Sequence, residues 1–334
     1  MHILICGGAG YIGSHMVKMA VEQGHTVTVF DNLSTGHRAA VQKGKWAHGD
    51  LLRPGDLEAV FGENDFHAVI HFAARSLVGE SMQDPGLYYV NNVKGTLNLL
   101  EAARRFSVSR IVFSSTAAVY GMPVRVPMDE AHPTQPINPY GRTKQMVEVM
   151  LADYAAAYGI RSAALRYFNA AGAAPDGQIG EAHTPETHLI PNILNAALYP
   201  GQPLSVFGDD YDTPDGTCVR DYIHVDDLCR AHLTAIDYIN HHPGTHVFNL
   251  GNGNGFSIRE VIRASETVTG CRIPFEIKGR RPGDPAVLVA DSRRAQAELG
   301  WTPRYTNMEA IIRTAWQWSQ APCYGNSVLP NPLK

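Results

Sequence analysis

Short apolar runs alternate with amphipathic stretches along the first half of the chain. Apolar runs of about four to eight residues bounded by turn residues are typical of buried strands, and apolar positions at a period of about 3.6 residues indicate helices. Strands that alternate with helices predict an α/β fold built around a doubly wound parallel sheet. The predicted strands are residues 2–6, 26–30, 46–48, 68–72, 110–113 and 161–166, and the predicted helices are residues 12–23, 56–61, 87–106 and 140–158.

The predicted helix at 140–158 opens with Tyr140 and Lys144, four residues apart and therefore on one helix face. Asn138 and Pro139 mark its start, because Asn caps free N–H groups and Pro fits the first helical position. An ammonium beside a phenol favours the phenolate. We therefore expect Lys144 to lower the Tyr140 pKa from about 10 and to make this tyrosine a general base. The apolar stripe behind the pair is Met146, Val147, Val149, Met150, Leu151, Tyr154 and Tyr158.

A glycine-rich turn, G-x-x-G-x-x-G at Gly7, Gly10 and Gly13, follows the first predicted strand. Between a strand and a helix, such glycines let backbone N–H groups approach a pyrophosphate, as in Rossmann-type dinucleotide sites. The second predicted strand ends at Asp31, where a carboxylate would bind the adenosine ribose hydroxyls and repel a 2′-phosphate. The pattern predicts NAD rather than NADP. The alternative is an aspartate that only caps a turn before Asn32.

Polar or aromatic residues stand where several predicted strands end. Asp31, Asp50, Phe72 and Thr116 all occupy such positions. Ligands of open α/β sheets bind at the carboxyl ends of the strands, so we expect these four side chains to converge on one crevice.

The pattern becomes irregular after residue 167, where loops rich in Gly, Pro and Asp separate short elements. Loops of that length in a compact protein usually carry function. We expect an NAD-binding Rossmann-type domain at 1–167 and a smaller substrate lobe at 168–334, with residues 221–250 packing back onto the main sheet. The tail at 327–334 is expected to be poorly ordered.

Composition describes a globular chain: of 334 residues, 44% are apolar and 18% are charged. The net charge of −4 gives no reason to expect nucleic acid or an anionic membrane surface as a partner. No apolar run approaches the roughly 20 residues that span a bilayer, and the N-terminus lacks the basic segment of a signal peptide. The five cysteines show no C-x-x-C and the fifteen histidines no H-E-x-x-H. We expect neither a disulfide framework nor a metal site, and a cytoplasmic location.

Several short motifs resemble the extended short-chain dehydrogenase/reductase superfamily. They are Gly7-Gly8-Ala9-Gly10-Tyr11-Ile12-Gly13, Asp31-Asn32-Leu33, His71-Phe72-Ala73-Ala74, Asn91-Asn92-Val93, Ser114-Ser115-Thr116 and Tyr140-x-x-x-Lys144. Later motifs narrow the resemblance to the UDP-glucose 4-epimerases. These are Arg166-Tyr167-Phe168-Asn169, the run from Gly216 to Val225, and Arg281-Pro282-Gly283-Asp284. The resemblance extends from Ile3 to about Trp316.

This resemblance implies that a tightly held NAD oxidises the sugar of a UDP-sugar at C4 and reduces it again on the other face, through a 4-keto intermediate. Tyr140 would exchange the proton of the 4-hydroxyl, and Thr116 would hydrogen-bond the 4-oxygen. Lys144 would lower the Tyr140 pKa and bind the nicotinamide ribose. The helices at 87–106 and 140–158 would pair with those of a second copy in a homodimer.

The resemblance also assigns binding positions. The cofactor set is Gly7, Gly10, Tyr11, Ile12, Gly13, Asp31, Asn32, Asp50, Leu51, Phe72, Ala73, Ala74, Asn91, Tyr140, Lys144 and Phe168. The substrate set is Thr116, Asn169, His188, Leu189, Phe207, Arg220, Arg281, Asp284 and Leu288. The two arginines would clamp the diphosphate with planar donors; the alternative for each is a surface ion pair. Leu288 stands where a bulky Tyr in the family excludes an N-acetyl group.

UDP-glucose and UDP-galactose are therefore the expected principal pair, with measurable turnover of the N-acetylated sugars. A UDP-N-acetylglucosamine 4-epimerase or a dual-specificity epimerase is the alternative. A sugar-nucleotide dehydratase would need acidic residues after Thr116, where Ala117-Ala118 stand, and an NAD-sensing regulator would be expected to have lost Tyr140 or Lys144. Two departures from the family are Ser76, where many members have Lys, and Thr116, which is often Ser.

Overall fold

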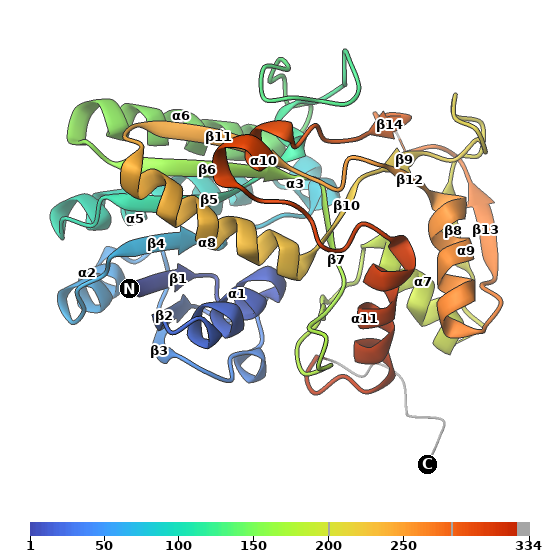
Figure 1. The fold of residues 1–334 in the computed structure, drawn as a ribbon, viewed down its shortest axis with the longest axis horizontal. Helices are drawn as coiled ribbons and strands as arrows, with labels where there is room; N and C mark the ends of the chain where they lie inside the picture. Colours follow the sequence, from blue (N-terminus) through green and yellow to red (C-terminus); the bar gives the residue numbers. More distant parts are fainter. Residues whose placement is uncertain (200, 282, 326–334) are drawn as a thin grey trace.

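The computed structural model describes residues 1–199, 201–281 and 283–325, so the expected disorder at 327–334 falls outside the described residues. A seven-stranded sheet forms its centre, in the order β11-β6-β5-β4-β1-β2-β3, and every neighbouring pair is parallel (Figure 1). The order reverses between β1 and β4, which confirms the predicted doubly wound fold class. The strands are β1 (His2–Cys6), β2 (Thr26–Asp31), β3 (Lys45–His48), β4 (Ala68–His71), β5 (Arg110–Thr116), β6 (Arg161–Tyr167) and β11 (Thr245–Leu250).

Helices cover both faces of this sheet. One face carries α1 (Tyr11–Glu22), α8 (Val225–His241) and α10 (Arg293–Leu299), and the other carries α2 (Pro54–Gly62), α5 (Gly95–Arg105) and α6 (Pro139–Tyr158). Because successive strand residues point to opposite faces, Ile3 and Ile5 pack with the first group while Leu4 and Cys6 pack with the second. Two separate hydrophobic cores therefore hold the sheet rigid.

Helix α6 begins where the sequence predicts. The Asn138 side chain accepts a hydrogen bond from the Gly141 backbone N–H over 2.8 Å, and Gly159 ends the helix with φ of +71°. Val147 and Leu151 of the predicted stripe are buried. Met146 and Val149 are instead 44% and 56% exposed and form an outer face, so the residues of the predicted stripe divide between two faces of α6.

The predicted helix at 87–106 forms, but it is not α-helical throughout. The structure has a short α4 (Pro85–Tyr88), a π-helical turn η2 (Tyr89–Lys94) and then α5. The wide turn directs the buried Asn92 amide inward, where it bonds both main-chain groups of Arg75 at 2.9 and 3.0 Å and the Thr143 hydroxyl at 3.0 Å. The hydrogen bonds of the buried Asn92 side chain thus accompany a local change from α-helix to π-helix, which apolar periodicity does not predict.

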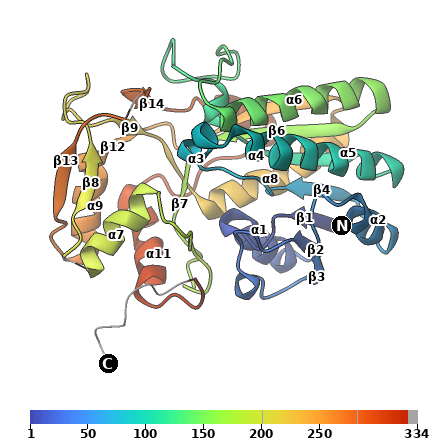
Figure 2. The same cartoon turned by 180° about the vertical axis from the view of Figure 1, so that it is seen from behind.

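A smaller lobe lies beside the carboxyl ends of the sheet strands (Figures 1 and 2). It shares one core among Ile193, Val261 and Ile311 of its three main helices. The segment at 221–250 contains α8 and β11, and β11 pairs with β6 of the main sheet. Within the described part of the chain, no helix is both long and apolar enough to cross a membrane. The lobe's elements are β7 (Asn169–Ala171) paired with β10 (Tyr222–His224), β8 (Leu204–Phe207) paired with β13 (Phe275–Lys278), β9 (Val219–Arg220) between β12 (Phe256–Ser257) and β14 (Val287–Leu288), α7 (Leu189–Leu198), α9 (Ile258–Thr269) and α11 (Met308–Gln320).

Candidate active site

The glycine turn after β1 packs directly on backbone. A Cβ at Gly7, whose φ is +78°, would lie 2.5 Å from the Ala73 nitrogen, and a Cβ at Gly13 would lie 2.1 Å from the Gly7 carbonyl oxygen. No larger residue fits at either position. The end of β4 therefore touches the turn without an intervening side chain, which brings Phe72 and Ala73 beside the start of α1.

The N-terminus of α1 fits a pyrophosphate. Gly10 occupies the N-cap with no side chain to cap the helix, and the described first turn contains no acidic residue. The first N–H groups of a helix lack intrahelical partners and carry partial positive charge. Tyr11, Ile12 and Gly13 therefore present the donors that a dinucleotide's phosphates require.

Asp31, at the end of β2, is held in place by backbone. Its Oδ2 accepts the Ala9 N–H over 2.9 Å and its Oδ1 accepts the Leu33 N–H over 2.8 Å. Burial raises the pKa of Asp31, and these two hydrogen bonds oppose the rise. Each carboxylate oxygen keeps a second lone pair for a ribose hydroxyl. The neighbouring Asn32 amide donates to Asp50 over 3.1 Å, which ties the ends of β2 and β3 into one rim.

The other predicted cofactor residues follow the same sheet edge. Ala74 continues the chain from β4, Leu51 follows β3, and Asn91 lies in η2. The Asn91 amide donates to the Asn92 side chain over 2.9 Å. Asn92, which the sequence analysis missed, thereby positions a predicted ligand residue.

Lys144 is buried next to the end of β5. Its Nζ donates to the Ser114 carbonyl oxygen over 2.7 Å and lies 5.9 Å from the centre of the Tyr140 ring. A Cβ at Gly141 would lie 2.4 Å from the Ala118 carbonyl oxygen, so the first turn of α6 sits directly on the short helix η3 (Ala117–Val119) that follows Thr116. This close approach brings Tyr140, Lys144 and the end of β5 together.

The expected lowering of the Tyr140 pKa is wrong for the protein by itself. Burial raises the pKa of Tyr140, and hydrogen bonding with Thr116 opposes the rise. Burial also lowers the pKa of Lys144 to about 7, against the attraction of Glu148. Loss of hydration disfavours the charged form of each group. In this site that effect outweighs the attraction between ammonium and phenolate.

A buried ion pair that the sequence analysis missed stands behind Lys144. Arg166 of β6 and Glu148 of α6 form a bidentate pair at 2.9 and 2.5 Å, and Ser115 donates to Glu148 over 2.5 Å. Glu148 lies four residues after Lys144 on the same helix face, and that spacing was the available signal. The pair fixes α6 against the ends of β5 and β6.

The predicted diphosphate residues converge in the smaller lobe. Arg220 pairs with Asp284 at 2.5 Å, and the Arg281 guanidinium lies 4.1 Å from the centre of the Phe207 ring. Burial raises the pKa of the Cys218 thiol, and the charges of Arg220, Asp284 and Arg281 all act on the same group. The three charged side chains therefore lie in one region of the lobe, near Cys218.

The predicted sugar-side residues border the end of β5. Phe168 and Leu288 pack against the small apolar cluster of Val119, Tyr120 and Met128. The Asn169 amide donates to the Asp221 carbonyl oxygen over 2.8 Å, so it is fixed between β7 and β10. Leu288 therefore lies in the same small cluster as Ala117, the residue after Thr116.

His188 and Leu189 lie at the start of α7, and Leu189 packs against the lobe core. The His188 Nδ1 lies 2.8 Å from a carboxylate oxygen of both Glu181 and Glu186. That ring nitrogen is therefore not available to a substrate. The structure gives His188 a role in a carboxylate cluster that its expected substrate role does not explain.

Comparisons with known proteins agree with this geometry. The model of the NAD dependent epimerase/dehydratase family matches residues 3–251. The chain belongs to this family. It is 50% identical to the UDP-glucose 4-epimerase of Halalkalibacterium halodurans over 98% of each chain. The structure matches UDP-glucose 4-epimerase from Brucella ovis in complex with NAD, with a TM-score of 0.92 and 50% identity over 95% of this chain and 98% of that one.

A second solved structure is the UDP-glucose 4-epimerase from Bifidobacterium longum in complex with NAD⁺ and UDP. Its TM-score is 0.91, with 39% identity over 96% of this chain and 98% of that one. The comparisons confirm the predicted family, the enzyme class and NAD as the cofactor. The glycine turn and the uncapped α1 are the features of this chain that fit that cofactor.

The structure bears on one departure from the family, the serine at position 76. Arg75 precedes Ser76, but its guanidinium pairs with Glu80 at 3.3 Å. Arg75 is thus engaged elsewhere and does not replace the lysine that many family members carry at 76.

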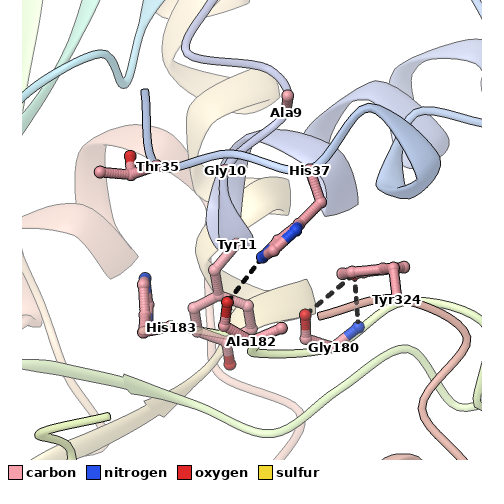
Figure 3. Close-up of a pocket in the computed structure, with 9 residues that line it drawn as sticks. All are labelled: Ala9, Gly10, Tyr11, Thr35, His37, Gly180, Ala182, His183 and Tyr324. Atoms are coloured by element: carbon pink, nitrogen blue, oxygen red, sulfur yellow. Dashed lines mark hydrogen bonds between the residues drawn. The ribbon is translucent and has the colours of Figure 1, made fainter. Parts of the chain in front are cut away.

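The two lobes meet over the glycine turn, where a small pocket lies (Figure 3). The His37 ring bonds the Ala182 carbonyl oxygen over 2.8 Å, and the Tyr324 hydroxyl bonds both main-chain groups of Gly180 at 3.0 and 2.9 Å. These contacts hold the 180–183 segment against the cofactor side. The pocket is lined by Ala9, Gly10, Tyr11, Thr35, His37, Gly180, Ala182, His183 and Tyr324.

Proposed function

We propose that the chain interconverts UDP-galactose and UDP-glucose by reversible oxidation at C4 of the sugar. The observation that carries the proposal is the meeting of Tyr140, Lys144 and Thr116 at the sheet edge that also holds the glycine turn. Arg220 and Arg281 stand in the facing lobe, where a diphosphate would be held. The chain thus offers acid–base groups and a cofactor site at the sheet edge, and two arginines for an anion in the smaller lobe.

When bound, NAD supplies reversible hydride acceptance at C4 and a positive nicotinamide ring, which favours the phenolate of Tyr140. Tyr140 takes the proton of the 4-hydroxyl as the 4-keto sugar forms. It returns that proton to the oxygen when C4 is reduced on its other face. Thr116 donates or accepts a hydrogen bond at the same oxygen, and Lys144 positions the phenol and the nicotinamide ribose.

Inversion requires the keto sugar to turn while the nucleotide stays bound. Arg220 and Arg281 provide planar donors for the diphosphate, and Phe207 lies against one of them. These contacts would hold the nucleotide part of the substrate and leave the sugar free to rotate. Leu288 forms an apolar wall without a hydroxyl, which supports UDP-glucose and UDP-galactose as the principal pair with measurable turnover of the N-acetylated sugars.

The active form is a homodimer in this proposal. Leu97 of α5 is 42% exposed, and Met146 and Val149 of α6 are 44% and 56% exposed. Side chains of this size on neighbouring helices are costly to leave in water. A second copy would cover them by forming a four-helix contact.

The test is an assay of purified protein with UDP-galactose and no added cofactor. UDP-glucose should form, and denatured protein should release about one NAD per chain, because the cofactor is regenerated in every turnover and need not leave. A supernatant without NAD, together with activity that depends on added NADP, would contradict the cofactor assignment. Selectivity for UDP-N-acetylgalactosamine by more than about a hundredfold, roughly 2.7 kcal/mol, would instead favour the alternative sugar.

A further inference from the structure

Four ionisable side chains from one loop meet in front of α7: Glu181, His183, Glu186 and His188. Their ligand-capable atoms, one from each residue, all lie within 4.8 Å of one another. Imidazole nitrogens together with carboxylate oxygens form a donor set that suits zinc and related ions. The sequence predicts no metal site, because it contains neither C-x-x-C nor H-E-x-x-H.

The spacing of these atoms matches four-coordinate geometry. Ligands at about 2.0–2.2 Å from a tetrahedral zinc ion lie about 3.3–3.6 Å from one another. The His188 Nδ1 lies 2.8 Å from both Glu181 and Glu186, and the His183 Nδ1 lies 3.0 Å from Glu181 and 4.0 Å from Glu186. The observed separations bracket the required ones, so small side-chain shifts would place all four donors around one ion.

The two carboxylates of this cluster would be stabilised by a bound cation. The Glu181 and Glu186 side chains are only 8% and 14% exposed. Throughout residues 1–199, 201–281 and 283–325, neither carboxylate has a Lys or Arg ion-pair partner; the side chains that bond them are His183 and His188, and the Thr187 and His188 backbone N–H groups donate to Glu186. Two poorly hydrated carboxylates are costly unless they are paired or coordinate a metal. A divalent ion would neutralise both and leave both imidazoles neutral.

The loop is held in position from outside the cluster. The Trp318 indole donates to the Glu181 carbonyl oxygen over 2.9 Å, and the His37 ring bonds the Ala182 carbonyl oxygen over 2.8 Å. Within the loop, Glu186 Oε1 accepts the His188 backbone N–H over 2.7 Å. Supports of this kind orient ligands before an ion arrives.

We propose that Glu181, His183, Glu186 and His188 form a structural site for a divalent cation of the zinc class. Four protein ligands close the coordination sphere, which is typical of structural rather than catalytic zinc. The ion would fix the loop that joins the glycine-turn pocket, through His183, to the start of α7, at His188. This role is independent of the chemistry at C4.

The competing occupant is a proton. A doubly protonated His188 between the two glutamates would satisfy one negative charge by hydrogen bonds alone. The two occupants differ in a direct measurement: a bound ion copurifies or can be titrated into the protein, whereas a proton leaves no metal in the sample.

The test measures zinc per chain by mass spectrometry in untagged, NAD-loaded protein, before and after incubation with ZnCl₂ and removal of free ion. Wild type should retain about one zinc, and His183→Ala and Glu186→Gln should each retain less than about a tenth of that. His241→Ala, at an exposed histidine on α8, should match wild type. Titration with CoCl₂ should give the intense visible absorption of four-coordinate Co²⁺ in wild type only.

Glu186→Gln keeps the shape of the side chain, and its NAD content reports whether the fold is intact. Wild-type protein that retains no zinc after incubation would overturn the proposal, whatever the variants do. Equal zinc in wild type and in a folded Glu186→Gln would overturn it as well, since the ion would then lie elsewhere.

Discussion

Lys144 donates a hydrogen bond to the main-chain carbonyl of Ser114 over 2.7 Å, so the ammonium is fixed to the end of strand β5 rather than to solvent. The same strand continues to Thr116, two residues further on. The lysine therefore couples the position of α6, which carries Tyr140, to the strand that carries the hydroxyl. Burial disfavours its charge and lowers the Lys144 pKa to about 7.

Replacing Lys144 with Ala should lower turnover at pH 7 by about 10²–10⁴-fold, because the phenol must ionise without the neighbouring ammonium. Burial raises the pKa of Tyr140, so the phenolate fraction in this variant grows about tenfold per pH unit below that pKa. In wild type the same rise in pH also deprotonates Lys144, whose pKa burial lowers to about 7, and the gain is smaller. A pH–rate profile from 7 to 9.5 checks this, with exposed Lys45→Ala as the control. If the ratio of variant turnover to wild-type turnover stayed constant across that pH range, the role given to Lys144 would be contradicted.

Asp31→Asn should change which dinucleotide the protein retains. The substitution removes the charge that repels a 2′-phosphate and weakens the acceptors for the ribose hydroxyls. We expect the ratio of bound NAD to bound NADP to fall by roughly tenfold, about 1.4 kcal/mol. The ratio is measured on cofactor released by denaturation after incubation with an equal mixture. Asp153→Asn, exposed on α6, is the matched control. An unchanged ratio of bound NAD to bound NADP in Asp31→Asn would show that Asp31 does not discriminate between the two ribose groups.

The strand ends and the Tyr140–Lys144 pair could be predicted because both follow from short-range rules. Parallel strands place their carboxyl ends at one edge, and residues four apart share a helix face. The direction of the Tyr140 pKa shift could not be predicted, because it depends on how deeply the folded protein buries the phenol. Periodicity likewise could not predict the inward position of Asn92, because its hydrogen-bond partner Arg75 is seventeen residues away.

Long-range pairing explains the other omissions. Glu148 stood at a helical spacing from Lys144, but its partner Arg166 lies on a different strand and became evident only in three dimensions. The cluster of Glu181 and His183 escaped notice because a loop without periodicity brings its ligands together. The exposure of Val149 shows a limit of helical periodicity: apolar residues on two different faces of one helix cannot be told apart from a single apolar stripe by their spacing alone.

Leu288→Tyr should narrow the choice of sugar. A phenol ring on β14 would advance the wall next to the cluster of Val119 and Met128 and crowd an acetamido group. Turnover of UDP-N-acetylgalactosamine relative to UDP-galactose should fall by about ten- to a hundredfold, or 1.4–2.7 kcal/mol. Both substrates are assayed side by side, with Leu288→Ala as the variant that enlarges the space. Unchanged selectivity in Leu288→Tyr would place the wall at another residue.

Val149→Glu should dissociate the homodimer. The side chain is 56% exposed on the outer face of α6, and a buried, unpaired carboxylate in a helix–helix contact is costly. Light scattering at micromolar concentration should give twice the 36.5 kDa chain mass for wild type and a single chain for the variant. Val124→Glu, 72% exposed outside the main helices, should remain dimeric. A monomeric wild type would remove the basis for this contact.

The central claim is that Tyr140 exchanges the proton of the sugar 4-hydroxyl. Tyr140→Phe keeps the ring and removes only the phenolic oxygen, so NAD content and UDP affinity should stay at wild-type values. The decisive measurement is the turnover of UDP-galactose by this variant at matched NAD content. We expect a fall of about 10²–10⁴-fold, the usual contribution of a positioned acid–base group. Turnover equal to wild type would contradict it.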